Sequence, residues 1–135
     1  MREILFRGID EGTKEWVYGY YYESQKPSDF GGERRYYIFD DKTISKYNVL
    51  PETIGQYTGL TDKNGKKIFE GDIIEFEDML GIINFNFGCY CVKTNKPDWK
   101  ARNNPAIDII FNEYPNAIKI IGNIHDNPEL LKGGE

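Results

Sequence analysis

Hydrophobic and polar side chains alternate along most of this chain, and alternation with a period of two is typical of half-buried β-strands. The clearest run lies within residues 82–92, where Ile83, Phe85 and Phe87 alternate with asparagines. We expect these three large side chains to face a core. Gly88 interrupts the run, and a glycine inside a strand pattern often marks a bulge or bend.

The same pattern predicts further strands at residues 3–9, 16–22, 36–39, 66–69, 72–77, 107–111 and 117–124. Polar loops are expected at residues 24–34 and 93–105, and a short helical turn at residues 127–131, where Asn, Pro and Glu occur in capping order. The ten Tyr, eight Phe and two Trp residues support this interpretation, because aromatic side chains favour pleated, half-buried surfaces.

A hairpin turn is expected where Asp62, Lys63, Asn64 and Gly65 separate two strand-like runs. The pair Asn64-Gly65 favours a type I′ turn, because both residues tolerate the positive φ that this turn needs. Taken together, the patterns predict a mainly β fold with three parts. These parts are an N-terminal antiparallel sheet (residues 1–50), a small barrel-like unit packed with it (residues 51–131) and a loose tail (residues 132–135).

The chain has 135 residues and a net charge of −5, with 22 acidic against 17 basic side chains. The acidic balance argues against non-specific affinity for phosphate backbones. No apolar run approaches the roughly 20 residues of a membrane span, and the apolar stretch at the N-terminus is too short for a secretory signal. We therefore expect a cytoplasmic protein that does not contact membranes.

Metal and redox chemistry find little support in the sequence. Cys89 and Cys91 are expected to share one face of a strand, where a mutual disulfide would be strained. A zinc site would need more ligands than these two thiols and the single histidine, His125. Two packed thiols are the better interpretation, and we expect no cofactor and no bound metal.

Two groups leave an enzyme open as an alternative. Five acidic residues could bind Mg²⁺ or form the solvent face of a strand: Glu70, Asp72, Glu75, Glu77 and Asp78. His125 and Asp126 could act as a general base with its orienting carboxylate or lie at the surface. No Ser or Cys nucleophile lies in a recognisable motif, so we assign no catalytic residue and expect a protein that is not an enzyme.

Two surfaces are candidates for binding. Tyr18, Tyr20 and Tyr22 share a face if their strand is regular, and an exposed tyrosine row gives a large contact area at low entropy cost. The alternative is that the row packs against the second lobe. The other candidate is a nucleic-acid surface on the basic loops 61–67 and 93–102, near Trp99, comprising Lys63, Lys66, Lys67, Lys100 and Arg102.

Three segments carry a family resemblance. Residues 2–10 read Arg-Glu-Ile-Leu-Phe-Arg-Gly-Ile-Asp. Residues 56–74 read Gln-Tyr-Thr-Gly-Leu-Thr-Asp-Lys-Asn-Gly-Lys-Lys-Ile-Phe-Glu-Gly-Asp-Ile-Ile. Residues 121–131 read Ile-Gly-Asn-Ile-His-Asp-Asn-Pro-Glu-Leu-Leu. In this order the segments resemble the YopX family of phage and prophage proteins, and the central one is the most specific.

The resemblance implies a small phage-encoded protein that acts in a bacterial cytoplasm. It implies no reaction and no catalytic residue, so no role is carried over to a position of this chain. We therefore expect a non-enzymatic module that binds a host or phage protein and could self-associate through its tyrosine-rich strands. The alternative is nucleic-acid binding through the two basic loops.

Overall fold

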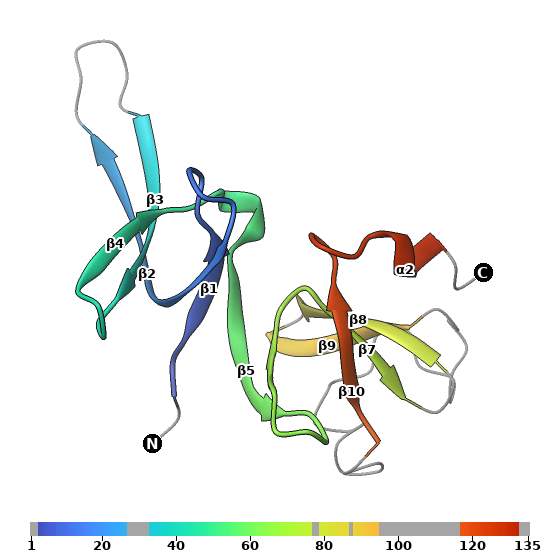
Figure 1. The fold of residues 1–135 in the computed structure, drawn as a ribbon. Helices are drawn as coiled ribbons and strands as arrows, with labels where there is room; N and C mark the ends of the chain where they lie inside the picture. The colour runs from blue at the N-terminus through green and yellow to red at the C-terminus, as the bar shows by residue number, and fades with distance from the viewer. Residues whose placement is uncertain (1–2, 27–32, 77–78, 87, 95–116, 133–135) are drawn as a thin grey trace. The chain divides into compact units, whose positions relative to one another are not determined.

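The computed structural model describes residues 3–26, 33–76, 79–86, 88–94 and 117–132 (Figure 1). The chain begins with the strands β1 (Phe6–Ile9), β2 (Trp16–Lys26), β3 (Glu33–Asp40) and β4 (Ser45–Asn48), followed by the 3₁₀ turn η1 (Pro51–Thr53). It continues with β5 (Gly55–Thr61), β6 (Lys67–Phe69), β7 (Asp72–Phe76), β8 (Met79–Asn86), β9 (Cys89–Thr94), β10 (Lys119–Asn123) and the helix α2 (Glu129–Lys132).

These strands form two antiparallel sheets, which confirms the expected mainly β class. The six-stranded sheet has the order β4-β3-β2-β1-β5-β6, and the four-stranded sheet has the order β10-β7-β8-β9. Strands β9 and β10 are the two edges of the smaller sheet, so the described residues do not close a barrel there. The strand expected at residues 107–111 lies outside the described residues.

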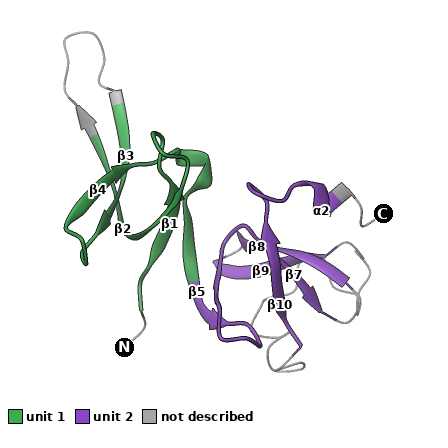
Figure 2. Cartoon of the chain, in the orientation of Figure 1, with its two compact units in different colours: residues 1–57 green, residues 58–135 purple. Residues whose placement is uncertain are grey.

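The chain divides into two compact units, residues 1–57 and residues 58–135 (Figure 2). Strand β5 begins in the first unit and ends in the second. Across the described ranges, no helix is both long and apolar enough to cross a membrane.

The first unit is built around the antiparallel strands β1 to β4, and the chain then returns to the end of β1. Asp10 and Val49 form an isolated antiparallel bridge, and the Leu50 N–H donates to the Ile9 carbonyl at 2.9 Å. Val49 is almost fully buried, and Gly8 lies against it so closely that a Cβ at Gly8 would press on its side chain. Ile38 completes the buried centre of this unit.

The loop expected at residues 24–34 is wrong at both ends, and its remaining residues 27–32 lie outside the described residues. Strand β2 runs to Lys26 and β3 begins at Glu33, and the two strands stay paired through Ser24↔Arg35 and Lys26↔Glu33. The ladder is held by main-chain hydrogen bonds, which polar side chains do not interrupt. Because this part of the hairpin buries no apolar stripe, the hydrophobic pattern gave no signal for it.

Strand β4 was also missed, although it pairs with β3 from Tyr37↔Asn48 to Asp40↔Ser45. The turn before β4 ends at Ile44, whose φ of 56° lies in the left-handed region. Isoleucine is disfavoured there, so the sequence gave no turn signal at the residue where the chain reverses.

The second unit has a continuous apolar core to which the smaller sheet, β6 and the residue before β10 contribute. Its buried members are Ile68, Ile74, Phe76, Met79, Ile83, Val92 and Ile118. Burying side chains of this size stabilises a fold by roughly 1.5–3 kcal/mol each, so this cluster is a major source of the unit's stability.

The single strand expected over residues 82–92 is in fact a hairpin of β8 and β9. Gly88, with a φ of 79°, lies in the turn between them. Ile83 is buried as expected, but Phe85 is 55% exposed and contacts Tyr90 edge to face, with 5.1 Å between ring centroids. Phe85 lies near the turn, where the core no longer covers the sheet, and Phe87 lies outside the described residues.

The turn between β5 and β6 is present, but it is not of type I′. Gly65 has a φ of 81°, whereas Asn64 does not have a positive φ. The Asp62 carboxylate accepts the N–H groups of Asn64 and Lys66, both at 2.9 Å. Such local bonds stabilise a turn in which only the last residue adopts the left-handed conformation, and glycine fills that position.

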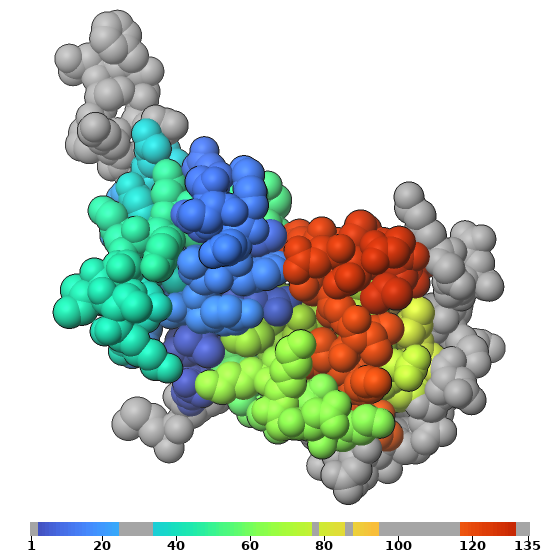
Figure 3. Space-filling model, viewed as in Figure 1, coloured from blue at the N-terminus to red at the C-terminus, as the bar shows by residue number. Residues whose placement is uncertain are grey.

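Asp62 also joins this turn to the far end of the chain. Its second carboxylate oxygen accepts the Ile120 N–H at 3.0 Å, and the Lys63 N–H donates to the Ile118 carbonyl at 2.9 Å. In Figure 3 the light green segment after β5 accordingly lies against the orange-red segment that contains β10. The carboxylate is buried, and its two oxygens accept the backbone N–H groups of Asn64, Lys66 and Ile120.

We expect Asp62→Asn to lower the free energy of unfolding by about 2 kcal/mol, because an amide NH₂ facing the Ile120 N–H leaves a buried donor unpaired. Burial opposes ionisation of Asp62, but the N–H groups of Ile120, Lys66 and Asn64 outweigh it and lower the pKa. The ionised Asp62 therefore stabilises the fold at neutral pH. This stabilisation begins to decline as the pH falls below about 4, the pKa of an unfolded aspartate, and is lost below the folded-state pKa.

Urea unfolding followed by far-UV circular dichroism at pH 7 and pH 3 tests this, with amide hydrogen exchange at Ile120 as the local readout. Glu75→Gln, which neutralises an exposed carboxylate of β7, is the matched control and should change little. Equal stability of Asp62→Asn and the control would contradict the structural role of Asp62.

Candidate functional site

Strand β2 presents three tyrosines to solvent. Tyr18, Tyr20 and Tyr22 alternate along the strand and are 45%, 54% and 41% exposed. Gly19 lets this strand run close to β3, because a Cβ at that position would collide with the Phe39 carbonyl. The row predicted from the sequence is thus an exposed aromatic surface on a hydrogen-bonded strand.

The neighbouring strands extend this surface. Tyr20 is paired with Phe39 and Tyr22 with Tyr37, so these side chains share one side of the sheet. The rings of Tyr22 and Tyr37 stack with centroids 5.1 Å apart and an interplanar angle of 27°. On β4, the Lys46 Nζ lies 4.6 Å from the centroid of the Tyr37 ring, within the range of a cation–π interaction.

We call this surface the Tyr face and define it by six residues: Tyr18, Tyr20, Tyr22, Tyr37, Phe39 and Lys46. Sequence reasoning proposed only the first three as a surface. The other three join it through the β2–β3–β4 register, which no local pattern specifies until the turn before β4 is known.

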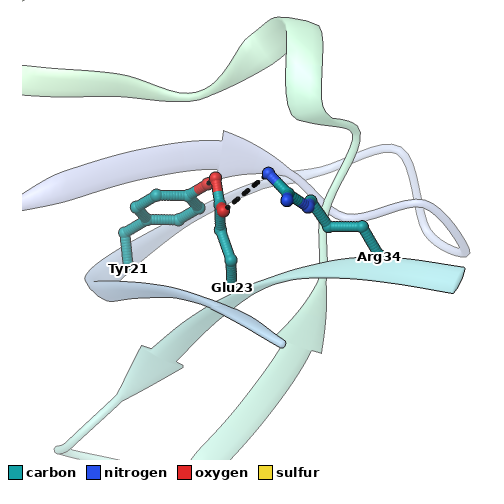
Figure 4. Close-up of polar contacts among 3 residues, drawn as sticks. All are labelled: Tyr21, Glu23 and Arg34. Atoms are coloured by element: carbon teal, nitrogen blue, oxygen red, sulfur yellow. Dashed lines mark hydrogen bonds and ion pairs between the residues drawn. The ribbon is translucent and has the colours of Figure 1, made fainter. Parts of the chain in front are cut away.

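The opposite side of the same strands carries a polar contact (Figure 4). The Tyr21 hydroxyl donates to Glu23 Oε1 at 2.6 Å, and Arg34 Nη1 lies 3.4 Å from Glu23 Oε2. Tyr21 also packs against Phe6, with 5.5 Å between ring centroids. Burial and the adjacent Glu23 carboxylate both raise the pKa of Tyr21, so its hydroxyl remains a donor at neutral pH.

Register positions on the tyrosine-bearing side of the sheet carry more cations than carboxylates, although Glu33 pairs there with Lys26 and Arg34 lies on the other side. The positions paired with Tyr20, Tyr22 and Ser24 include the cations Lys46 and Arg35 and no carboxylate. The acidic residues Glu23 and Asp40 alternate with them and belong to the opposite side. The Tyr face is therefore aromatic and cationic within an acidic chain.

The alternative nucleic-acid surface is only partly within the described residues. Lys63, Lys66 and Lys67 are exposed around the β5–β6 turn. Lys100 and Arg102 lie outside the described residues. The buried carboxylate of Asp62 lies at the base of the same turn and is surrounded by backbone donors.

The acidic cluster is divided by its surroundings. Asp72 is buried and accepts the Phe69 N–H at 2.8 Å, which holds the turn between β6 and β7, whereas Glu75 is exposed. Glu77 and Asp78 lie outside the described residues. In the part of the chain that the structure describes, no three His, Cys, Asp or Glu side chains are grouped as metal ligands would be.

His125 and Asp126 are arranged by Asn123. The Asn123 side-chain oxygen accepts both backbone N–H groups, at 3.0 Å from His125 and 2.9 Å from Asp126. The Asp126 carboxylate in turn accepts the Asn123 amide at 3.1 Å. These bonds shape the turn between β10 and α2, so the pair has a structural explanation.

The two thiols lie on β9, with their sulfurs 3.5 Å apart. A disulfide bond is about 2.05 Å long, so both cysteines are reduced. Cys91 is buried, as expected for a packed thiol, whereas Cys89 is exposed.

The fold and the Tyr face define a small, mainly β protein with an exposed aromatic surface and no recognisable reaction centre among its described residues. The model of the YopX protein family matches residues 5–132, and the chain belongs to this family. The resemblance inferred from the three sequence segments is therefore confirmed.

The chain is also similar to a solved structure, that of protein EF1440 from Enterococcus faecalis. The two are 25% identical, with a TM-score of 0.57, and the match covers 97% of this chain and 99% of that chain. A comparison with curated proteins gave no match.

Replacing Tyr21 by Phe should lower the free energy of unfolding by about 1 kcal/mol at neutral pH, because the hydrogen bond to Glu23 is lost. Since folding raises the pKa of Tyr21, the native protein should also lose stability as the pH rises above about 10, the value for an unfolded tyrosine. The Phe variant should lack this part of the alkaline loss.

Urea unfolding between pH 7 and pH 11 measures both effects. Tyr20→Phe, a hydroxyl removal on the opposite side of the same strand, is the control. If both variants behave alike, the Tyr21–Glu23 bond does not contribute as inferred.

Proposed function

We propose that this protein is a non-enzymatic binding module whose Tyr face contacts a host or phage protein in the bacterial cytoplasm. The observation that carries the proposal is the exposure of Tyr18, Tyr20 and Tyr22 together on one strand. Tyrosine is enriched at protein interfaces, because it buries much area and has few rotatable bonds to immobilise.

The Tyr face is also held in place before any partner arrives. Tyr22 stacks on Tyr37, and Tyr37 lies under Lys46, so these side chains lose little freedom on binding. Pre-ordered side chains lower the entropic cost of association, which favours affinity without new contacts.

Nucleic-acid binding is the alternative, with Lys63, Lys66 and Lys67 as its described part. The net charge of −5 opposes it, because non-specific nucleic-acid binding depends on neutralising phosphates. The two functions use different surfaces, which allows variants to separate them.

The double variant Tyr20→Ser, Tyr22→Ser should lose the partner while keeping the fold, because both side chains are largely exposed. A pull-down from bacterial host lysate, with and without nuclease and read by mass spectrometry, should give a nuclease-resistant partner for the native protein and none for this variant. Phe85→Ser, which removes an exposed aromatic of the second unit, is the matched control and should retain the partner.

A partner retained by the Tyr20, Tyr22 double variant would exclude the Tyr face. Partners that disappear with nuclease, and with Lys63→Glu, Lys66→Glu, would establish nucleic-acid binding instead.

A further inference from the structure

We infer that the Tyr face takes an acidic polypeptide segment with apolar side chains, and that Ile44 is a binding residue beside it. This inference rests on the proposed function and adds the chemistry of the partner. Three observations carry it: a strained exposed isoleucine, the cations of the Tyr face and the position of the carboxylates.

Among the large hydrophobic residues that the structure describes, Ile44 is the most exposed, at 79%, and its φ is 56°. The left-handed conformation costs an L-residue roughly 1–2 kcal/mol, and a β-branched residue there is an outlier. Because the Ile44 side chain is mostly exposed, it buries too little apolar surface in the isolated chain to offset this cost. Strained residues of this kind cluster at binding and active sites, which makes Ile44 a candidate contact.

The strained turn leads directly into the Tyr face. Ile44 immediately precedes β4, where Ser45 pairs with Asp40 and Lys46 pairs with Phe39. The turn itself contains Asp41 and Lys42, which offset each other in charge. An apolar residue and a cation are therefore presented at one end of the aromatic row.

Charge complementarity selects the occupant. Lys46 and Arg35 lie on the side of the sheet that bears the tyrosines, and Glu23 and Asp40 lie on the other. Glu33 also has a register position on the tyrosine side, but it pairs with Lys26 at the end of the hairpin away from Lys46 and Ile44. A second copy docked face to face would bring together two surfaces with the same excess of cations, because a two-fold interface uses the same patch on both copies. An acidic segment instead meets the cations with carboxylates.

A polypeptide fits these features better than a nucleic acid. Phosphates would suit Lys46, but a nucleic acid gains little from an exposed isoleucine, and the net charge of the chain repels it. A peptide with alternating acidic and apolar residues satisfies both requirements. Its carboxylates reach Lys46 and Arg35, and its apolar side chains pack on Tyr20, Tyr22 and Ile44.

The test uses the full chain and three fluorescent probes in anisotropy titrations. The probes are a short peptide of alternating Glu and Leu, its Lys and Leu counterpart, and an oligothymidylate of similar length. We expect the acidic peptide to bind most tightly and its affinity to fall with added salt. Lys46→Glu should weaken it about tenfold, whereas Lys63→Glu, the same charge change on the second unit, should change it little.

Ile44→Asn separates binding from folding. Asparagine tolerates positive φ, so this variant should unfold at the same or a higher urea concentration than the native protein. Its affinity for the acidic peptide should nevertheless fall about fivefold, as for an apolar contact removed from an interface. A variant that loses stability and keeps its affinity would show that Ile44 serves the fold instead.

Each remaining outcome overturns the inference. These outcomes are no binding of the acidic peptide, equal binding of both peptides, preference for the oligothymidylate, or an affinity unchanged by Lys46→Glu. Capture of the partner from lysate could be lost in the Tyr20→Ser, Tyr22→Ser variant and retained in Lys46→Glu and Ile44→Asn. That result would support the Tyr face as a binding surface and contradict an acidic partner. A dimer that dissociates in the tyrosine variant, seen by sedimentation, would assign the face to a second copy.

Discussion

The second unit depends on one buried carboxylate. Asp62 accepts hydrogen bonds from Asn64 and Lys66 in its own turn and from Ile120 on β10, a residue 58 positions away. Local bonds alone would stabilise the turn, and core packing alone would leave the position of β10 along its neighbours less defined. A single side chain that does both ties the hairpin to the strand that pairs with β7. Its ionised form is favoured because the donors outweigh the cost of burial.

The segment that identifies the family is therefore a structural segment. Within residues 56–74, Thr58 donates its hydroxyl to the Ile68 carbonyl, Asp62 holds one turn and Asp72 the next. None of these polar groups is left for a ligand, because each is buried and already hydrogen-bonded. The Tyr face lies outside this segment, on β2, β3 and β4. The buried polar groups of this segment thus support the scaffold, while the family match covers residues 5–132 and includes the Tyr face.

The sequence predicted what depends on local periodicity or on a single turn residue. It indicated the β class, the exposed tyrosine row as one alternative, and a turn at Gly65. It failed for the polar residues around Ser24 and Arg35, which form paired strands although they have no hydrophobic pattern. It also failed at Ile44, which adopts a left-handed turn conformation that isoleucine disfavours. Tyr37 and Lys46 could not be placed beside Tyr22, because register between strands is a tertiary property.

The two sides of β2 follow from the same alternation. Tyr20 and Tyr22 face solvent, while Tyr21 and Glu23 form a polar contact with each other and with Arg34 on the opposite side. A shift of β2 by one residue in register would exchange the two sets, so Tyr20 and Tyr22 would leave the side that bears Tyr37 and Glu23 would enter it. Of the contacts in Figure 4, the pair of Glu23 and Arg34 joins β2 to β3 and opposes that shift, whereas the Tyr21–Glu23 bond lies within β2. The register that keeps Glu23 away from the Tyr face thereby maintains the aromatic and cationic character of that face.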